Sequence, residues 1–580
     1  MPSLPRIALL LSAFVAASTM SPLASAQGAE DLSEETEAVP SEYVVDLKDD
    51  VDGAALEGLR AKVRDLGATL DWNSTSSPEG DHLALLRGTE DRSVLARAIE
   101  RLRGDAHVEA LEESLVFRAS FVPNDPLYKE KQWHLARVGA ERAWDYGCGH
   151  GVTVAVIDTG VACFDKGPFT RGTDLQGTRC KGGYNFVHDV DEAYDDQGHG
   201  THVAGTIAQT TNNERGVAGL AHCANLMPVK VLNKNGWGTL ADVAEGIRYA
   251  ADHGAQIINL SLGGPRPASV LEKAVRYAER KGVLIVAAAG NSGRSVGYPA
   301  AYPGVLAVSA TDSGDRIAWF SSRGPQVGIA APGVSVTQQT ICDGGKNKCE
   351  LFGTFNGTSM ASPHVAGAAA LVAGLGVSSP DALRSALTGT AAAKDDAKLY
   401  GAGLLDAGNA VLRTHWARAL ERALAIVAFF ALVAMRVRKR GWLFLTPGAV
   451  VASLVAGVGL LPFLPLLGVL PTLGEARPLA ELLMRPFGEW DLFVGHSLHR
   501  WLLLASAGPA LLGYAVFFGV RSLRPVLGGF AVGAAALLAQ TALMADVAFP
   551  MGTFLLRVFA VANIAVLLWL ARLGLDRKPT

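Results

Sequence analysis

The chain has 580 residues, a length that predicts more than one domain. Its formal net charge of −3 gives no electrostatic reason to expect a nucleic-acid partner. Hydrophobic residues make up 49% of the chain and crowd into long apolar runs in its last third, whereas the first two thirds have the pattern of a soluble protein.

The N-terminus has the order of a secretory signal peptide, predicted over residues 1–26. Arg6 precedes an apolar run at 7–17, and the small residues Ala24-Ser25-Ala26 follow. The run is short for a membrane span. An anchor that is never cleaved is the alternative, but the small-residue ending favours cleavage. Residues 27–40 are acidic and lack apolar periodicity, which predicts a flexible leader.

A small α+β unit is predicted next. Its strands are expected at 43–47, 83–86 and 108–116, and its helices at 54–66 and 93–102. A unit of about 80 residues has a marginal core, so it is expected to be most stable with a partner.

Residues 142–412 alternate continuous apolar runs with helical periods. The runs at 152–157, 257–260, 283–289 and 305–310 are typical of strands buried on both faces. Two amphipathic helices are expected at 240–251, capped by Thr239, and at 269–281, ended by Gly282. This alternation predicts an α/β domain with a mostly parallel sheet.

All six cysteines lie between positions 148 and 349. An even number in an exported segment predicts disulfides, and the absence of a C-x-x-C pair makes zinc the weaker reading. Loop length favours three pairs: Cys342 with Cys349, Cys163 with Cys180, and Cys148 with Cys223.

After residue 415 the apolar runs predict five membrane spans, near 418–435, 442–470, 501–520, 526–545 and 548–571. The second contains Pro462 and Pro465, so a kinked or partly re-entrant segment is expected there. Buried helices of a soluble core are the alternative.

Basic residues follow the first, third and fifth of these spans and set the expected orientation. They are Arg436, Arg438, Lys439 and Arg440; Arg521 and Arg524; and Arg572, Arg577 and Lys578. The positive-inside rule places these loops and the C-terminus in the cytoplasm. The residues before the first span then lie outside, which agrees with the signal peptide.

Three glycine-rich motifs supply an acid, a base and a nucleophile. Asp158 ends a buried strand, His199 starts a small-residue helix, and Ser359 stands at the mouth of an apolar helix. A serine hydroxyl is a weak nucleophile that needs a neighbouring base, and the base needs an orienting carboxylate.

The motifs 154–160, 198–205 and 357–367, in the chain order Asp, His, Ser, resemble those of the subtilisin family over roughly residues 123–412. The resemblance implies a subtilisin-like α/β fold and a serine endopeptidase that cleaves polypeptides through an acyl-enzyme. An inactive subtilisin-like binding domain is one alternative, against which the complete triad argues. A membrane transporter or sensor with an accessory protease domain is another, with Gln540 and Arg557 as its intramembrane polar candidates.

The resemblance also implies substrate-site residues. Asn291 resembles the family's oxyanion donor, which acts together with Ser359. Ser261, Leu262 and Gly263 resemble the strand that pairs with the substrate backbone. Gly297 resembles the floor of the primary pocket, where a glycine leaves room for a large apolar side chain.

Calcium is the implied structural cofactor, because Asp125, Asp174 and Asn213 resemble parts of one calcium site of the family. A second acidic set resembles another site less closely, and a solvated acidic loop is its alternative; it comprises Asp189, Asp191, Asp195 and Asp196.

The α+β unit resembles the family's inhibitor-type pro-segment, with release by self-cleavage near residues 117–122. The predicted domains are thus a signal peptide (1–26), an inhibitory pro-segment of ferredoxin-like α+β type (27–121), a catalytic domain (122–412) and an all-α multi-pass membrane region in contact with lipid (413–580).

Overall fold

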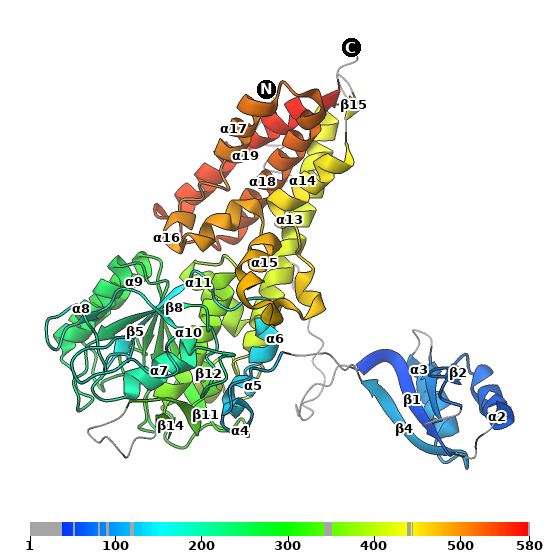
Figure 1. Ribbon diagram of the computed structural model, residues 1–580, viewed down its shortest axis with the longest axis horizontal. Helices are drawn as coiled ribbons and strands as arrows, with labels where there is room; N and C mark the ends of the chain where they lie inside the picture. Colours follow the sequence, from blue (N-terminus) through cyan, green and yellow to red (C-terminus); the bar gives the residue numbers. More distant parts are fainter. Residues whose placement is uncertain are drawn as a thin grey trace. The chain divides into compact units, whose positions relative to one another are not determined.

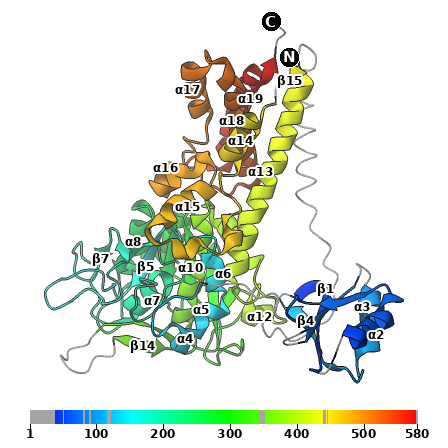
Figure 2. The ribbon, with the colours of Figure 1, turned by 45° about the vertical axis from the view of Figure 1, so that its right-hand side comes forward.

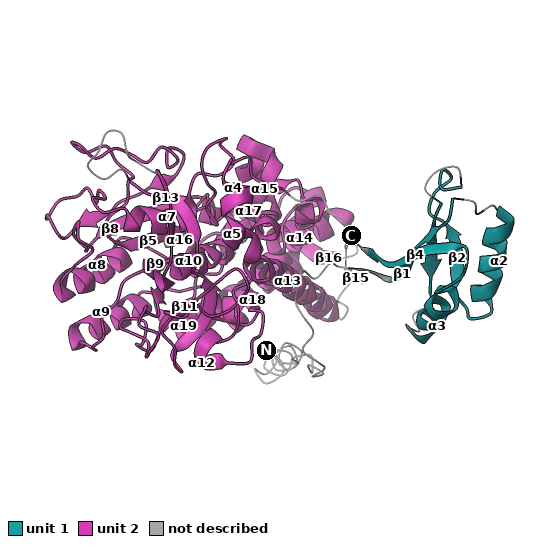
Figure 3. Ribbon diagram, turned by 90° about the horizontal axis from the view of Figure 1, so that it is seen from below, with its two compact units in different colours: residues 1–119 teal, residues 120–580 magenta. Residues whose placement is uncertain are grey.

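The computed structural model describes residues 38–49, 51, 53–78, 82–88, 92–115, 121–341, 351–437, 442–443 and 445–577. The chain divides into two compact units, Met1–Ala119 and Ser120–Thr580 (Figure 3). The predicted signal peptide, most of the predicted release site, and Cys342 with Cys349 lie outside the described residues.

The first unit has the predicted α+β composition. Its antiparallel sheet has the strand order β2-β3-β1-β4, and side chains from strands and helices share one core that includes Val45, Leu56, Leu86 and Ala98. The elements are β1 (Ala38–Leu47), α2 (Gly53–Arg64), β2 (Thr69–Trp72), β3 (Leu83–Arg87), α3 (Arg92–Leu102) and β4 (Val108–Leu115). The sequence prediction missed only β2.

The second unit begins with a sheet region, residues 121–406, built on a parallel sheet of order β12-β11-β10-β9-β5-β8-β6, with β7 also paired to β8. Its strands are β5 (Thr153–Asp158), β6 (Arg179–Cys180), β7 (Tyr184–Asn185), β8 (Asn225–Lys230), β9 (Ile257–Leu260), β10 (Leu284–Ala288), β11 (Val305–Thr311) and β12 (Val327–Pro332). The predicted parallel α/β architecture is confirmed.

Helices cover both faces of this sheet, because alternate side chains of each strand enter two different cores. Val154 and Val156 of β5 pack in one core with α7 and α10, whereas Ala155 and Ile157 pack in the other with α8 and α9 (Figure 1). The larger helices are α7 (His199–Ala208), α8 (Leu240–Asp252), α9 (Ser269–Arg280), α10 (Thr358–Gly374) and α11 (Pro380–Thr388).

Smaller elements complete the sheet region. They are α4 (Tyr128–Lys131), α5 (Trp133–Arg137), α6 (Ala140–Trp144), α12 (Ala397–Tyr400) and the hairpin of β13 (Val336–Gln339) and β14 (Phe352–Phe355). Thr239 caps α8 as predicted, accepting a 3.1 Å hydrogen bond from Asp242 N. The predicted disulfides Cys148–Cys223 and Cys163–Cys180 are both present.

The helical region, residues 407–577, follows without a break, since α13 (Ala407–Val437) crosses the predicted boundary at 412. The α-helices after it are α14 (Pro447–Gly457), α15 (Arg477–Met484), α16 (His496–His499), α17 (Ala507–Phe517), α18 (Arg524–Met544) and α19 (Gly552–Leu575). The 3₁₀ turns are η1 (Leu464–Leu467), η2 (Leu470–Ala476), η3 (Phe487–Phe493) and η4 (Arg521–Leu523), and β15 (Trp442–Leu443) pairs with β16 (Asp576–Arg577). Figures 1 and 2 both show α13, α14, α18 and α19 gathered into one bundle.

Within the described residues, two helices are long and apolar enough to cross a membrane, by length and composition alone: Arg521–Met544 and Gly552–Leu575. Residues 442–470 form an interrupted segment, as their prolines predicted, whereas the prediction of a span at 501–520 is wrong. In the first, the longest helix is the 11-residue α14, which ends at Gly457; Gly459 then takes a positive φ of 132°, and prolines and the 3₁₀ turn η1 follow. The second contains only the 11-residue α17, which begins after Leu502 at a φ of 52°.

Candidate active site

Asp158 and His199 meet at the carboxyl end of β5. The Asp158 side chain is fully buried, and its Oδ1 lies 2.7 Å from His199 Nδ1. Thr159 N also donates to Asp158 Oδ1, at 2.7 Å. Because a carboxylate only accepts hydrogen bonds, His199 carries its proton on Nδ1 and leaves Nε2 free to act as a base.

The electrostatics of this pair favour a protonated histidine during reaction. Burial of His199 opposes its protonation, but the charge of Asp158 and the hydrogen bond to it outweigh burial and raise the pKa of His199.

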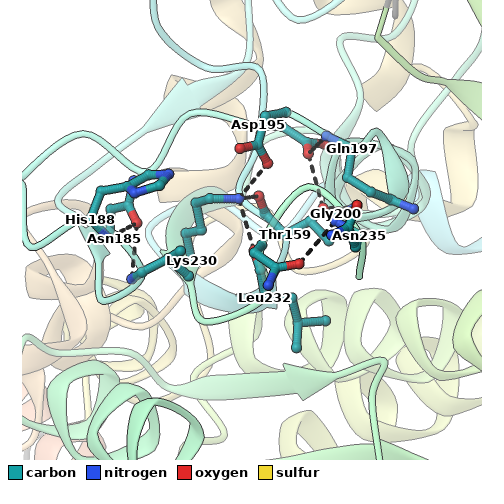
Figure 4. A network of polar contacts seen from close by, with 12 residues as sticks. Thr159, Asn185, His188, Asp195, Gln197, Gly200, Lys230, Leu232 and Asn235 are labelled. Atoms are coloured by element: carbon teal, nitrogen blue, oxygen red, sulfur yellow. Dashed lines mark hydrogen bonds and ion pairs between the residues drawn. The ribbon is translucent and has the colours of Figure 1, made fainter. Parts of the chain in front are cut away.

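A buried polar network, which the sequence motifs did not reveal, supports the Asp158 turn. Asp195 accepts from Thr159 Oγ1 at 2.9 Å, and Thr159 Oγ1 accepts from Gly200 N at 2.9 Å. The fully buried Lys230 donates to Thr159 O at 2.5 Å and to Leu232 O at 2.8 Å (Figure 4). A lysine at the end of an apolar strand was the available signal, since a lysine is rarely buried without partners.

Ser359 lies in the first turn of α10 and is held against the end of β9. Its hydroxyl donates to Ser261 O at 2.9 Å, while Ser261 Oγ donates to Ser359 O at 2.7 Å. Asn259 Nδ2 donates to Ser261 Oγ, and Ser362 Oγ donates to Asn259 Oδ1, at 2.9 and 2.7 Å. This buried chain locks α10 onto β9, and sequence reasoning found neither Asn259 nor Ser362.

The Ser359 hydroxyl therefore donates to Ser261 rather than to His199. Catalytic hydrogen bonds are often loose in substrate-free enzymes and form when the substrate is bound.

Asn291 is oriented by the residue before the serine. Its Oδ1 accepts from Thr358 N and from Thr358 Oγ1, both at 2.9 Å. With the carboxamide oxygen occupied, the Nδ2 group remains to donate to a ligand. Gly290 N completes the arrangement by donating to Thr358 Oγ1 at 3.1 Å.

A cleft of about 550 Å³ opens beside His199 and Ser261. Leu262, Gly263, Trp237 and Tyr298 are among the other residues that line it. Three of the four predicted substrate-binding residues, Ser261, Leu262 and Gly263, therefore share one cleft with His199.

The fourth, Gly297, lies directly beneath this lining. Gly264 and Tyr298 exchange two 2.8 Å backbone hydrogen bonds next to it. A Cβ at Gly297 would lie 3.1 Å from Gly264 O, so a larger residue would crowd this pairing.

Asp125 and Asp174 have the features of a cation site. Asp125 is 3% exposed and its Oδ1 has no hydrogen-bond partner, while Oδ2 accepts from Asn212 N at 2.7 Å. Burial raises the pKa of Asp174 to about 6, and burial also raises that of Asp125. Two buried carboxylates that resist ionisation fit a calcium ion, which supplies the compensating charge.

The third predicted ligand, Asn213, fits less well. Its Nδ2 donates to Asp174 Oδ1 at 2.7 Å, and its Oδ1 accepts from Arg215 N at 3.0 Å. Its carboxamide oxygen is therefore already engaged.

Two members of the second acidic set, Asp195 and Asp196, already have partners within the protein. Asp195 accepts from the backbone amides of its own loop, including Gly198 N at 2.9 Å. Asp196 Oδ1 lies 2.6 Å from Lys230 Nζ, so a lysine supplies the positive charge at this position.

The second unit resembles known proteases over most of the sheet region. Residues 149–403 match the subtilase family. The chain is 40% identical to the thermophilic serine proteinase of Bacillus sp. (strain AK1), over 58% of this chain and 79% of that protein. It is 39% identical to thermitase of Thermoactinomyces vulgaris over 53% of this chain and 100% of thermitase, and 44% identical to subtilisin BL of Lederbergia lenta over 47% of this chain and 96% of that protein.

Among solved structures, the chain is similar to the proteases from Pseudoalteromonas arctica PAMC 21717, with 31% identity and a TM-score of 0.47 over 51% of this chain and 100% of that one. The identity and coverage of the thermophilic serine proteinase, thermitase and subtilisin BL place the chain in the subtilase family. It is a subtilisin-like serine protease.

Proposed function

We propose that this protein is an exported serine endopeptidase, made with its own inhibitory pro-segment and held at a membrane by its helical region. The observation that carries the catalytic part is the His199–Asp158 hydrogen bond at the end of β5, with Ser359 anchored at the adjacent end of β9.

The proposed roles are those that the resemblance to the subtilisin family implies. Ser359 Oγ attacks the scissile carbonyl carbon, and its proton passes to His199 Nε2. Asn291 Nδ2 and Ser359 N donate to the oxyanion that forms. Collapse releases the amine, which takes the proton from His199, and leaves an acyl-enzyme. Water then repeats these steps against the ester, while Asp158 stabilises the imidazolium.

The apolar lining of the cleft and the glycine at 297 favour substrates with a large apolar residue before the scissile bond. Phe, Leu or Tyr is expected there. A measured preference for Arg or Lys would reject this specificity.

The first unit is proposed to act as the intramolecular inhibitor. It is a self-contained α+β unit that precedes the catalytic region in the chain, with its own core. Self-cleavage after it would free the protease, so release should depend on Ser359.

Calcium is proposed as a structural ion held by Asp125 and Asp174. Bound there, it would neutralise two buried carboxylates and tie the segment before α4 to the loops around Asp174 and Asn212.

Three helices are proposed to span the membrane, rather than five: α18 and α19, which meet the length and composition test, and α13, which does not meet it but lies in the same bundle (Figure 1). Helix α18 has 21 residues and α19 has 24, which at 1.5 Å each is about 31 and 36 Å, enough for a hydrocarbon core of about 30 Å. Helix α13 is longer, and the pairing of β15 with β16 puts its far end beside the far end of α19.

The ends of these helices support the predicted orientation. The turn between α18 and α19 touches the sheet region, since Ser378 N donates to Asp546 O at 2.8 Å. The opposite ends carry Arg436, Arg524 and Arg572, and the positive-inside rule favours this end as the cytoplasmic side. An odd number of spans keeps the catalytic region outside and the C-terminus inside.

An activity-based label tests the catalytic proposal directly. The full chain, purified in detergent, should react with a fluorophosphonate and hydrolyse casein, and the Ser359→Ala variant should do neither. Labelling of both proteins would mean that another residue is the nucleophile.

A further inference from the structure

The segment between α14 and α17, residues 458–506, is here termed the junction segment. The helices on either side of it are half the length of a membrane span. Each has 11 residues, or about 16 Å, against the roughly 30 Å of a hydrocarbon core.

Both short helices lie at the basic end of the bundle. Arg524 Nε, at the start of α18, donates to Phe518 O at the end of α17, at 2.8 Å. Helix α14 packs against the first half of α18, where a Cβ at Gly529 would lie 1.9 Å from Ala449 O and one at Gly533 would lie 2.2 Å from Ser453 O. The chain therefore leaves α14 near the middle of the bundle.

The junction segment lies beside the second half of α18, nearer the sheet region. A Cβ at Gly488 would lie 2.4 Å from the Leu537 side chain. Gln540 Oε1 accepts from Arg422 Nε at 3.2 Å, and Arg422 also pairs with Glu489 of η3. These contacts place η3 at the level of the last two turns of α18.

In the junction segment charged side chains are buried and many apolar side chains are exposed, which is the reverse of the usual arrangement in a water-soluble protein. Its buried charged residues are Arg477, Glu481, Arg485, Glu489 and Asp491, each 8% exposed or less. Its exposed apolar residues include Leu460 at 49%, Phe463 at 65%, Leu466 at 66%, Leu467 at 68%, Leu479 at 58% and Val494 at 77%. Within the described stretch 458–495, Glu475 is the exposed charged residue.

Four of these five charged residues have an ion-pair partner inside the protein, and Arg485 instead lies over the Phe493 ring, 5.5 Å from its centroid. Glu489 lies 2.8 Å from Arg418 of α13, Arg477 lies 2.9 Å from Glu481, and Asp491 lies 2.7 Å from His499. Charges on a water-facing segment gain most from hydration, so they are normally the exposed groups. Inward pairing with outward apolar side chains is the arrangement favoured when the surroundings cannot solvate charge.

We infer that the junction segment is embedded in the outer leaflet of the membrane, with Leu460, Phe463, Leu466 and Leu467 in contact with lipid acyl chains. The inference rests on the proposed membrane tether and assigns its lipid contact to a segment that does not span. Helix α19 exposes the same kind of apolar surface, because only 28% of its most apolar stretch is buried.

The test uses the full chain with Ser359→Ala, which prevents self-cleavage, as single copies in phosphatidylcholine nanodiscs. One environment-sensitive fluorophore is attached at a time, to Leu467→Cys in the junction segment, Val561→Cys in α19 or Val270→Cys in α9. Val561 and Val270 are exposed to similar extents, 58% and 52%, and serve as the membrane and water controls.

Nitroxide-labelled lipids report depth. The Leu467 probe should lose more fluorescence to a nitroxide near the headgroup than to one near the chain end. The Val561 probe should show the reverse order, because it lies about 14 Å from the start of α19. The Val270 probe should respond only to aqueous iodide.

If iodide quenches the Leu467 probe while lipid nitroxides quench only Val561, the inference is wrong and the tether stands. If the Leu467 probe is shielded from both quenchers, protein rather than lipid covers the segment, and the inference is also wrong. If neither Leu467 nor Val561 responds to lipid, the membrane tether itself fails.

Discussion

The sheet region and the helical region belong to one compact unit but sort their apolar side chains in opposite ways. In the described part of the sheet region, the exposed large hydrophobic residues are Trp237, Leu240, Val270 and Trp319, and two of these line the cleft. All the others in the second unit lie between Leu420 and Leu573.

This difference is the pattern expected if the sheet region lies in water and the helical region lies in a membrane, as proposed above. The sheet region hides its apolar residues because water drives them inward. In the helical region the buried groups include Arg418, Arg422 and Glu489, whose mutual pairing is the alternative to exposing charge to an apolar medium. Variants in each region should therefore fail in different ways.

The largest effect is expected from Ser359→Ala, which removes the nucleophile from the sheet region and leaves the helical region untouched. Turnover should fall by about six orders of magnitude, because the triad acts as a unit. Casein hydrolysis measures this, and gel mobility should show that the pro-segment is retained. Ser385→Ala, at an exposed position on α11, is the matched control and should keep full activity. Full hydrolysis by the Ser359 variant would sink the catalytic assignment.

Arg418→Ala attacks the contact between the two regions. The Arg418 guanidinium donates to Leu375 O at the end of α10, the helix that contains Ser359, and it pairs with Glu489 and Asp546. Removing one partner of a buried ionic network costs about 3–5 kcal/mol. The half-life of activity at raised temperature in nanodiscs should shorten sharply. Arg276→Ala, which breaks an exposed pair on α9, should change stability by less than about 1 kcal/mol. Equal effects would show that the contact is dispensable.

A third variant, Asn291→Leu, tests the proposed oxyanion site within the sheet region. It removes the oriented oxyanion donor, and kcat should fall by about two to three orders of magnitude, the effect known for the asparagine donor of subtilisin. KM should change little, because the donor acts on the transition state. An unchanged kcat would remove Asn291 from the oxyanion site.

Calcium should stabilise the sheet region in a pH-dependent way. The pKa of Asp174 is raised to about 6 from its ordinary 3.8, so the folded state without metal binds the extra proton below that value. Its stability is then greatest at low pH and is lost as pH rises through about 6. Adding calcium at 100 times its Kd should restore about 2.7 kcal/mol near neutral pH.

Melting temperatures with and without chelator at pH 5 and pH 8 check this. The chelator should lower the melting temperature more at pH 8. Asp125→Asn should weaken the response to calcium, and Asp196→Asn, which touches the Lys230 site, should leave it in place. A chelator effect that is equal at both pH values would argue against Asp174 as a ligand.

The smallest effect concerns the acid limb of activity. Neutral His199 is the base, and its pKa is raised above 6.5 by Asp158, so kcat/KM should fall as pH drops through a value above 6.5. The pH dependence of kcat/KM for a soluble peptide measures this value. A half-point well below 6.5 would mean that burial, and not Asp158, dominates.

Local sequence predicts the candidate reacting groups because each of them lies in a short motif at the end of an element. Asp158 is the last residue of a strand buried on both faces, and His199 and Ser359 lie in the first turns of helices. The pattern of each element therefore helps to locate its motif in the sequence. Continuous apolar runs predicted the parallel sheet, because the strands of such a sheet are covered by helices on both faces.

The supporting contacts could not be predicted in this way, since they join residues that are far apart in the chain. Three hydrogen bonds are examples. Ser359 donates to Ser261 O, Thr358 N donates to Asn291 Oδ1, and Lys230 donates to Thr159 O. Each joins two residues that only the complete fold brings together.

The helical region divides along the same line. Composition alone predicts that residues after 415 favour an apolar medium, because they contain long apolar runs. Tertiary structure decided which runs are full helices. A hydropathy average over many residues does not detect Gly459 and Leu502, which have positive φ angles next to the ends of short helices. It also contains no information on the ion pairs of Glu489 with Arg418 and Arg422, which join different parts of the bundle. The burial of a charge depends on its partner, and the partner is supplied only by the fold.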